Sequence, residues 1–379
     1  MVGEPRLPCM QGQRVTTDAT HRGPRVSIVL AVYNGERHLR AAIHSLLTQT
    51  FTDFELIVVN DGSTDRSRDI VLASSDPRIR LLDNPQNLGL TPSLNRGIDA
   101  ARGEFIARLD ADDVATPNRL ACQVAFLDRH PEIALVGSWW RRIDEKGRRL
   151  GREQSPLDHT LLRWSLLFYC PFTHSSVTWR RNAVNDEVGQ YDSAFSYAMD
   201  WEYWSRIASR LRVANIGRVL ANYRVGPYSM TANHPRVVAE TRAARETSLR
   251  AVFNGAAEAW IAEGPRLFAL VEGWPEGANR EDVRDSIDAV VQLQESFADQ
   301  VSVTGRELNG MRRFVRTWIA HRLLTTGRKA HLVGRKNMGS VLFAEARRMH
   351  APSLLTINGG RYFAARILAA LSPGAFRPK

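Results

Sequence analysis

Asp110 and Asp112 are the two residues of this sequence whose type and spacing best suit metal chemistry. In an extended segment, side chains two positions apart point to the same side, so both carboxylates can face one ligand. Such a pair suits Mg²⁺ or Mn²⁺, which binds one or two carboxylates together with substrate phosphates. The alternative is an acidic turn before a helix that starts at Thr116-Pro117. Because we expect Thr116 to cap that helix, the upstream acids need another explanation, and we favour the metal site.

Two further acids, Asp200 and Glu202, stand among aromatic residues in Asp200-Trp201-Glu202-Tyr203-Trp204. A carboxylate at the entrance of a helix can act as a general base and take a proton from an attacking hydroxyl. An aromatic ring such as that of Trp201 offers a flat apolar face to a sugar. We expect Asp200 to be the general base, with Glu202 as the second candidate for this role. The other interpretation is an amphipathic helix with its aromatic residues in the core.

Asp61 and His174 are weaker candidates. Asp61, in Asn60-Asp61-Gly62-Ser63, can accept hydrogen bonds from a base or ribose, or can be an ordinary turn aspartate. His174 lies in a loop before a strand and can contact the acceptor or a phosphate, although a single histidine is more often structural.

The first half of the chain must position these residues, and it alternates strand and helix patterns. Continuous apolar runs predict strands at residues 26–32, 54–59, 79–82, 104–109 and 133–137. Helices are predicted between them, at residues 38–47, 65–73, 91–100 and 117–130. We expect Ser63 or Thr64 to cap the second of these helices. The alternation predicts an α/β fold with a mostly parallel sheet, in which ligands bind at the carboxyl ends of the strands. The polar clusters at residues 33–34, 60–63 and 110–113 all fall at those ends.

The pattern changes after Trp140. We predict helices at residues 158–169 and 200–208, and extended segments at 175–179 and 213–223. From residue 235 the chain is mainly helical, with helices at 237–252, 281–301, 306–324, 341–349 and 362–371. The expected organisation is a disordered segment at residues 1–23, an α/β domain at 24–230 and a mainly helical, basic C-terminal region at 231–379.

The net charge of +11 comes from the end of the chain. From Thr304 onward, fifteen Lys and Arg face two acids, which gives +13 and leaves −2 for the rest. Such a tail can be a solvated face or a patch for anionic lipid. It lacks the interleaved aromatic residues of single-strand binders, so we expect no nucleic acid partner. Residues 361–371 can form a basic amphipathic helix that either contacts an anionic membrane or packs on the protein's own helices.

Cysteine content and hydropathy bear on the compartment. Three cysteines are too few and too scattered for a disulfide framework or a cysteine metal site. We find neither a signal peptide nor a run of about 18 apolar residues, the length of a membrane span. We therefore expect a cytoplasmic protein, peripheral on the cytoplasmic face of the inner membrane if its basic C-terminus binds lipid.

Four ordered stretches resemble the family 2 glycosyltransferases, which have the GT-A fold. They cover about residues 25–225 and read VSIVLAVYNGERHLRAAIHSLLTQTFTDFELIVVNDGSTD, NPQNLGLTPSLNRGIDAARGEFIARLDADDVATPNRL, PFTHSSVTWRR, and AMDWEYWSRIA followed by VLANYRV. The resemblance implies an inverting transfer of one sugar from a nucleoside-diphosphate sugar to an acceptor hydroxyl. The site residues that it implies are Tyr33 and Asp61 at the donor, with Glu36 from the same loop, Asp110 at the ribose and metal, Asp112 at the metal, and Asp200 as the base.

The sequence departs from the family pattern at two positions. Ala31 stands where Pro or Thr usually precedes Val-Tyr-Asn, and Met199 replaces the first acid of the pair often seen at the base. The processive members carry Gln-x-x-Arg-Trp, whereas Arg163-Trp164 follows Thr160 here. We therefore expect a bacterial-type, non-processive enzyme that acts on a glycan or lipid-linked acceptor in cell-surface polysaccharide, lipopolysaccharide or related glycan biosynthesis.

The sequence argues against three other classes of protein. Dinucleotide-dependent enzymes and sugar-1-phosphate nucleotidyltransferases would need a glycine-rich turn after the first strand, which here reads Ala-Val-Tyr-Asn-Gly-Glu at residues 31–36. A non-catalytic sugar-nucleotide-binding protein would be expected to lack Asp112 or Asp200, and both are present.

Overall fold

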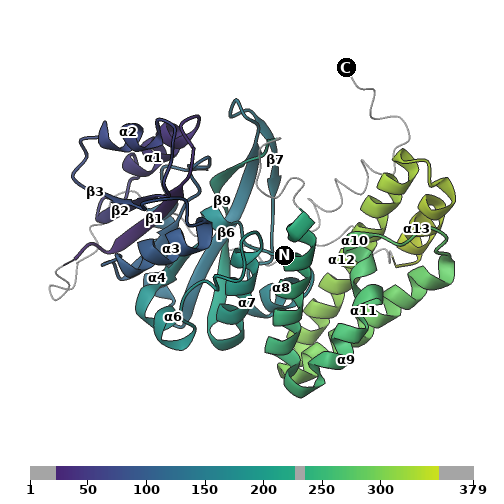
Figure 1. The fold of residues 1–379 in the computed structure, drawn as a ribbon. Coiled ribbons are helices and arrows are strands. Elements are labelled where there is room, and N and C mark those ends of the chain that lie inside the picture. Colours follow the sequence, from purple (N-terminus) through teal and green to yellow (C-terminus); the bar gives the residue numbers. More distant parts are fainter. Residues whose placement is uncertain (1–22, 227–234, 350–379) are drawn as a thin grey trace, which may run out of the picture. The chain divides into compact units, whose positions relative to one another are not determined.

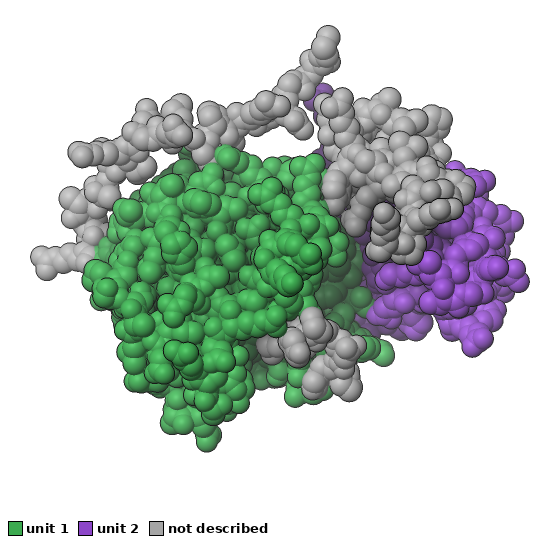
Figure 2. Space-filling view, turned by 90° about the horizontal axis from the view of Figure 1, so that it is seen from above, with its two compact units in different colours: residues 1–248 green, residues 249–379 purple. Residues whose placement is uncertain are grey.

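The computed structural model describes residues 23–226 and 235–349 (Figure 1). The chain forms two compact units, Met1–Ser248 and Leu249–Lys379, which Figure 2 shows in different colours. Almost all of the predicted disordered segment, residues 1–23, and the whole predicted helix at residues 362–371 lie outside the described residues. The predicted domain boundary at residue 230 stays a prediction, because helix α8 (Pro235–Phe253) runs across the division between the units.

Unit 1 is built on a nine-stranded sheet with the order β3-β2-β1-β4-β8-β6-β9-β5, and β7 pairs with β6 off this path. The pairings β3–β2, β2–β1, β1–β4 and β6–β9 are parallel. β8 pairs antiparallel with both β4 and β6, so the sheet is mixed. The strands are β1 (Val26–Val32), β2 (Phe54–Asn60), β3 (Ile79–Asp83), β4 (Phe105–Arg108), β5 (Val114–Ala115), β6 (Ile133–Ile143), β7 (Arg149–Glu153), β8 (Thr178–Arg180) and β9 (Arg212–Arg224).

The two central strands, β1 and β2, are buried at every position. Their alternate side chains enter two hydrophobic cores, one on each face of the sheet: Val29 and Ile57 lie in one, Ile28 and Leu56 in the other. Burying each such side chain stabilises the fold by about 1.5–3 kcal/mol. The helices that follow the first strands are α1 (Leu39–Leu47), α2 (Ser67–Leu72), α3 (Leu90–Asp99) and α4 (Arg119–Arg129). This alternation confirms the predicted α/β arrangement.

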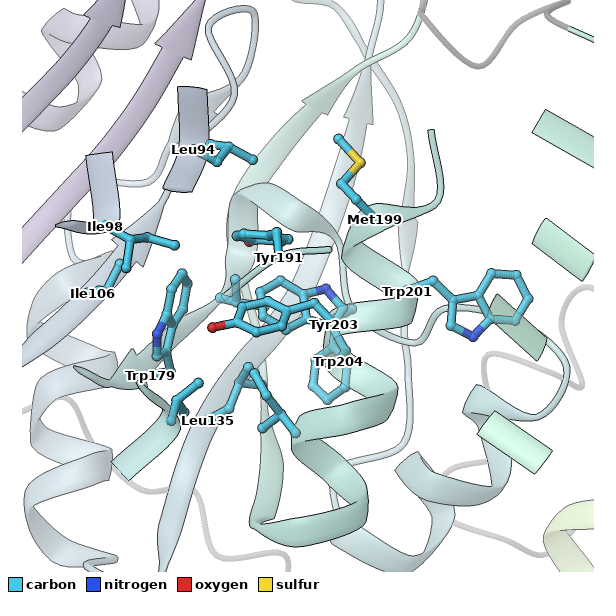
Figure 3. Packing of buried hydrophobic residues seen from close by; sticks show 14 of the residues in the cluster. Leu94, Ile98, Ile106, Leu135, Trp179, Tyr191, Met199, Trp201, Tyr203 and Trp204 are labelled. Carbon is cyan, nitrogen blue, oxygen red and sulfur yellow. The ribbon is translucent and has the colours of Figure 1, made fainter. Parts of the chain in front are cut away.

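An aromatic cluster in one of these cores supports the second half of unit 1 (Figure 3). The rings of Trp179 on β8 and Trp204 on α7 (Met199–Arg210) lie 5.7 Å apart at 62°, a favourable edge-to-face arrangement. Tyr191 packs against Tyr203 with ring centroids 4.2 Å apart. The cluster therefore fixes helix α7 on the sheet, and with it the residues at the start of that helix. The remaining helices of this unit are α5 (His159–Leu166), η1 (His174–Ser176) and α6 (Arg181–Glu187).

Unit 2 is helical in its described residues. A capping box formed by Asn279 and Asp282 starts its second-longest helix, α11. The buried Glu345 carboxylate lies 2.8 Å from Arg280 and 3.2 Å from Arg284, which joins α13 to α11. None of the described helices is both long and apolar enough to span a bilayer. Its helices are η2 (Asn254–Ala256), α9 (Ala257–Ala262), α10 (Gly264–Glu272), α11 (Arg280–Gln300), α12 (Gly305–Leu332) and α13 (Lys336–Met349).

Three local predictions require correction. Thr116 does not cap a helix: its N–H bonds the carbonyl of Leu220 on β9 at 2.9 Å, so the chain stays extended and α4 begins only at Arg119. Neither Ser63 nor Thr64 caps α2, because the Asp65 carboxylate accepts the Ser67 N–H at 2.9 Å and the helix starts there. The predicted strand at residues 175–179 is instead the turn η1 followed by β8.

Candidate active site

Two loops, after β1 and β2, are joined into one surface at the carboxyl ends of these strands. The N–H groups of Asn34 and Gly35 donate to the hydroxyls of Ser63 (3.1 Å) and Ser67 (2.8 Å). In the other direction, Glu36 accepts the Arg66 N–H at 3.1 Å. Asn34 has φ of 49°, a left-handed conformation that asparagine tolerates better than most residues. Beside this rigid pair of loops, the Tyr33 side chain is 49% exposed and is therefore available to a ligand.

Asp61 is buried and supports a third loop. Its carboxylate accepts the N–H groups of Leu88 (2.9 Å) and Gly89 (3.0 Å) and the side-chain amide of Asn84 (2.7 Å). These bonds hold the segment between β3 and α3 against the end of β2. They give Asp61 the structural role that the sequence left open. Its predicted donor contact stays a prediction.

Asp110 follows β4 and is held by its neighbours. Arg108, which is completely buried, forms an ion pair with Oδ1, and the Ser175 hydroxyl donates to Oδ2 at 3.0 Å. Burial alone would raise the pKa of Asp110, but Arg108 and Ser175 outweigh it and hold the pKa below its ordinary value. Sequence analysis missed Arg108. A charged residue in the apolar strand Phe105–Arg108 was the available signal.

Asp112 differs from Asp110 in being exposed, and its carboxylate has no ion pair or hydrogen bond with another described residue. Although Asp112 reaches the surface, the protein around it removes part of its hydration, and this desolvation together with the negative charge of Asp110 raises the pKa of Asp112 to about 6. The next residue, Asp113, is fully buried, and its Oδ1 accepts the Arg224 N–H at 2.7 Å. Asp113 is therefore a structural acid, whereas Asp112 is free to bind a ligand.

This pair fits a divalent cation. Asp112 presents unpartnered carboxylate oxygens, and the mutual repulsion of two close carboxylates is relieved by a positive ion between them. Within residues 23–226 and 235–349, no three His, Cys, Asp or Glu side chains gather into a complete metal site. The remaining ligands would thus come from phosphate and water, as is usual for Mg²⁺.

Asp200 lies in the first turn of α7 and is partly exposed. Its Oδ1 accepts the Trp201 N–H at 2.7 Å, which fixes the orientation of the carboxylate. Burial, with a smaller contribution from the negative charge of Asp110, raises the pKa of Asp200 to about 6. The structure thus brings Asp200 within electrostatic reach of the Asp110–Asp112 pair and gives it the pKa of a general base that works near neutral pH.

Glu240 on α8 holds the segment that leads into Asp200, and sequence analysis missed it. Its Oε2 accepts three consecutive backbone N–H groups, those of Ser196 (2.8 Å), Tyr197 (2.6 Å) and Ala198 (3.2 Å). A carboxylate in such a cradle of amides makes charge-assisted hydrogen bonds, the stronger kind. Nothing in the sequence of α8 distinguishes Glu240 from Glu246 on the same helix, so no sequence pattern could have identified it.

We expect Glu240→Gln to lower kcat about tenfold with little change in the KM for the donor, because small displacements of a catalytic group are costly. The neutral amide can still accept some of the three bonds, so the protein should fold. Glu187→Gln is the matched control, since Glu187 is an exposed glutamate at the end of α6, outside the site. Hydrogen exchange at residues 196–198 should rise in the first variant alone. Equal kinetics for both variants would contradict this role.

His174 lies beside Asp110 but is largely buried. Its Nε2 is 2.9 Å from the Tyr191 hydroxyl, and its Nδ1 is 3.8 Å from Asp110 Oδ1. Burial and the nearby Arg108 lower the pKa of His174 to about 3, so the imidazole is neutral. A neutral, buried ring is a poor phosphate ligand. His174 therefore lies against Asp110 as a buried structural residue. Its predicted contact with the acceptor stays a prediction.

The structure does not bring Trp201 and Glu202 into the site. The Trp201 indole N–H donates to the Leu166 carbonyl at 2.8 Å, and Arg245 stacks on its ring. In Figure 3 this ring points away from the other aromatic residues. Glu202 is buried in an ion pair with Arg206 at 2.6 Å. Both side chains already have protein partners, so the acceptor contacts predicted for them have no support in this geometry.

Comparison with known proteins identifies the family of this chain. A model of "Glycosyl transferase family 2" matches residues 27–189. The amylovoran biosynthesis glycosyltransferase AmsE of Erwinia amylovora is 32% identical, over 53% of this chain and 76% of that protein. The UDP-Glc:alpha-D-GlcNAc-diphosphoundecaprenol beta-1,3-glucosyltransferase WfgD of Escherichia coli is 30% identical, over 55% of this chain and 80% of that protein.

Other relatives are matched over less of their length. An uncharacterized glycosyltransferase of Haemophilus influenzae and the putative glycosyltransferase EpsE of Bacillus subtilis are matched over 66% and 60% of their lengths. Among solved structures, S. aureus TarS 1–349 in complex with UDP-GlcNAc is similar in fold, with a TM-score of 0.55 and 18% identity over 86% of this chain and 93% of that one.

The mixed sheet with its flanking helices, together with the similarity in fold to TarS, confirms the predicted GT-A fold. The sheet is mixed rather than mostly parallel as predicted, because four of its eight strand pairings are antiparallel. With relatives at this identity and coverage, the chain belongs to the family 2 glycosyltransferases.

Proposed function

We propose that this protein is an inverting glycosyltransferase that moves one sugar from a nucleoside-diphosphate sugar to an acceptor hydroxyl. The observation that carries the proposal is that the charge of Asp110 acts both on the exposed, unpartnered Asp112 and on Asp200, whose pKa is raised to about 6. The first suits a metal–diphosphate complex and the second suits proton abstraction. Family membership supports the same assignment.

The donor would lie along the carboxyl ends of β1, β2 and β4. Tyr33 would stack on the base, Asp61 and Glu36 would line the nucleoside side, and Asp110 would contact the ribose. Asp112, with Asp110, would hold Mg²⁺ or Mn²⁺. When bound, this ion neutralises the charge that develops on the departing diphosphate.

Asp200 would perform the proton transfer. Its Oδ1 is occupied by the Trp201 N–H, which leaves Oδ2 to receive the proton of the acceptor hydroxyl. As that oxygen bonds to the anomeric carbon, the bond from this carbon to the diphosphate breaks on the opposite side, so the configuration inverts. One such base and no second nucleophile are sufficient for a single displacement. Retention of configuration in the product, determined by NMR, would exclude this mechanism.

The raised pKa of Asp200 predicts an acid limb in the pH profile. A general base works when deprotonated, so kcat/KM, which reports the pKa values of the free enzyme, should be constant well above pH 6 and fall about tenfold per pH unit well below it. Mn²⁺ must be saturating at each pH, because a proton on Asp112 would otherwise weaken metal binding in the same range. A midpoint of the acid limb near pH 4, the ordinary pKa of aspartate, would contradict the buried environment assigned to Asp200.

The relatives support a proposal for the acceptor and the pathway. AmsE acts in amylovoran biosynthesis and WfgD takes a diphosphoundecaprenol-linked sugar, as their names state. We propose that this protein likewise adds a sugar to a glycan or lipid-linked acceptor during cell-surface polysaccharide synthesis. Its place would be the cytoplasm, peripheral on the inner membrane, where such acceptors are found.

A donor screen tests the proposal. Purified protein is incubated with Mn²⁺ and a panel of nucleoside-diphosphate sugars, and the released nucleoside diphosphate is measured with and without a mixture of membrane lipids. One donor should release far more than the rest. A sugar-nucleotide-binding protein would bind a donor without releasing the diphosphate, and a nucleotidyltransferase would release inorganic pyrophosphate from a nucleoside triphosphate instead.

A further inference from the structure

A basic hairpin, defined here as residues 141–153, projects from the sheet at the end of β6 and returns as β7 (Figure 1). It carries six basic and three acidic residues, a net charge of +3, within a region, residues 1–303, whose total is −2. The basic residues are Arg141, Arg142, Lys146, Arg148, Arg149 and Arg152, and the acids are Asp144, Glu145 and Glu153.

The acids of the basic hairpin are already committed to structural pairs. Asp144 shapes the turn by accepting the N–H groups of Lys146 (2.9 Å) and Arg148 (2.8 Å). Glu153 pairs with Arg142 at 3.1 Å, and Glu145 with Arg37 at 2.8 Å. The exposed basic side chains on the turn and at the start of β7 include Lys146 and Arg149. This surface therefore attracts anions.

Two arginines face each other across the basic hairpin. Arg141 and Arg152 are direct partners in the antiparallel register, an arrangement that destabilises a strand pair when both residues carry the same charge. Protection of an edge strand from aggregation is the structural alternative. That purpose is served by charges of either sign, whereas here the exposed charges are nearly all positive. The bias points to a negatively charged partner.

The basic hairpin lies at the rim of the donor site. The Arg224 guanidinium bridges the two: its Nε donates to the Asp112 carbonyl at 2.7 Å, and its Nη1 to the Asp144 carbonyl at 2.8 Å. Glu145 also accepts from His38, just beyond the loop that carries Tyr33, at 3.1 Å. A molecule bound at Asp112 and Asp200 thus has this positive surface at its edge.

We propose that the basic hairpin binds a phosphate group of the acceptor, and so selects acceptors that carry phosphate next to the accepting sugar. The inference rests on the function proposed above, and it assigns the acceptor's chemistry by charge complementarity. The donor diphosphate is already accounted for by Asp112 and the cation. The acceptor is the other molecule that must reach Asp200, and an anionic acceptor would be drawn toward a site whose rim is positive.

The test measures binding of dodecyl diphosphate, and of uncharged dodecyl maltoside, to the full chain with Mn²⁺ and saturating UDP or GDP, by calorimetry. Arg149→Gln/Arg152→Gln should weaken dodecyl diphosphate binding about tenfold, and less at high salt. Arg129→Gln/Arg212→Gln is the matched control: it removes two exposed charges, and Arg212 lies at the opposite end of β9 from Arg224. The control should bind like wild type, and nucleotide binding should be equal in all three proteins.

Several results would overturn the proposal. One is equal binding of dodecyl diphosphate by wild type and the hairpin variant, and another is equal affinity of wild type for the uncharged maltoside. A loss of nucleotide binding in the hairpin variant would assign the hairpin to the donor instead. Binding to phosphatidylglycerol vesicles without binding to dodecyl diphosphate would make it a membrane patch. A failure of the proposed function is distinguishable, because it appears as no release of nucleoside diphosphate by wild type in the donor screen, which does not use dodecyl diphosphate.

Discussion

Asp200→Asn should lower kcat by about two to four orders of magnitude, the contribution typical of a general base. Asparagine is nearly isosteric, and its carbonyl oxygen can still accept the Trp201 N–H that Asp200 accepts at 2.7 Å. The helix start should therefore keep its conformation. Donor binding does not use this carboxylate, so the KM for the donor should stay within about twofold. Steady-state kinetics with the donor from the screen measure both values.

Asp186→Asn is the matched control for Asp200→Asn. Asp186 is an exposed aspartate on α6, outside the site, and should tolerate the same substitution without kinetic effect. A decrease in kcat of less than about threefold for Asp200→Asn would mean that another group takes the proton. Because Glu202 is buried against Arg206, it could not serve as that group without breaking its ion pair.

Asp112→Asn should lower kcat/KM by about a thousandfold and weaken the response to Mn²⁺. Bound metal ions contribute several kcal/mol to the stabilisation of developing charge, and about 4 kcal/mol corresponds to this factor. The Asp112 carboxylate is exposed and makes no ion pair or hydrogen bond with another described residue, so its loss should leave the stability of the protein unchanged. Titration of activity with Mn²⁺ at fixed donor concentration measures the change in metal affinity.

The neighbouring residue supplies the control for Asp112→Asn. Burial and the charges of Asp110 and Asp112 raise the pKa of Asp113 well above its ordinary value. The carbonyl oxygen of asparagine can still accept the Arg224 N–H that Asp113 accepts at 2.7 Å, so Asp113→Asn should cost less than about tenfold in kcat/KM. If both substitutions have the same effect, the acidic segment acts through its structure and Asp112 is not a specific metal ligand.

The sequence predicts the parallel half of the sheet well because its signals are local. The apolar runs of β1 and β2 fall within one residue of their predicted ends, since burial on both faces demands a continuous run. The short strand β5 was not predicted, and the extended segment predicted at residues 175–179 covers only part of β8. Their two and three residues carry too little pattern, and pairing with distant β9 and β4 creates them. The positions of these short strands are therefore set by long-range hydrogen bonds, which local sequence propensity does not reveal.

The candidate site also has one part that the sequence predicts and one part that it does not. The convergence of Asp110 and Asp112 with the loops after β1 and β2 follows from the strand order, because parallel strands share one carboxyl edge. The residues that hold the acids could not be read from the sequence. Glu240 reaches the segment before Asp200 from a helix about 40 residues later, and Ser175 reaches Asp110 across 65 positions. Contacts of this kind exist only in the folded chain.

Metal dependence of the reaction tests the central assignment most directly. Release of nucleoside diphosphate by the wild-type protein is measured with the preferred donor, in Mn²⁺ and after chelation, beside Asp200→Asn under the same conditions. Release should disappear on chelation, return with added Mn²⁺, and fall by about two to four orders of magnitude in Asp200→Asn. Release that survives both metal removal and Asp200→Asn would contradict a transferase site built on Asp112 and Asp200.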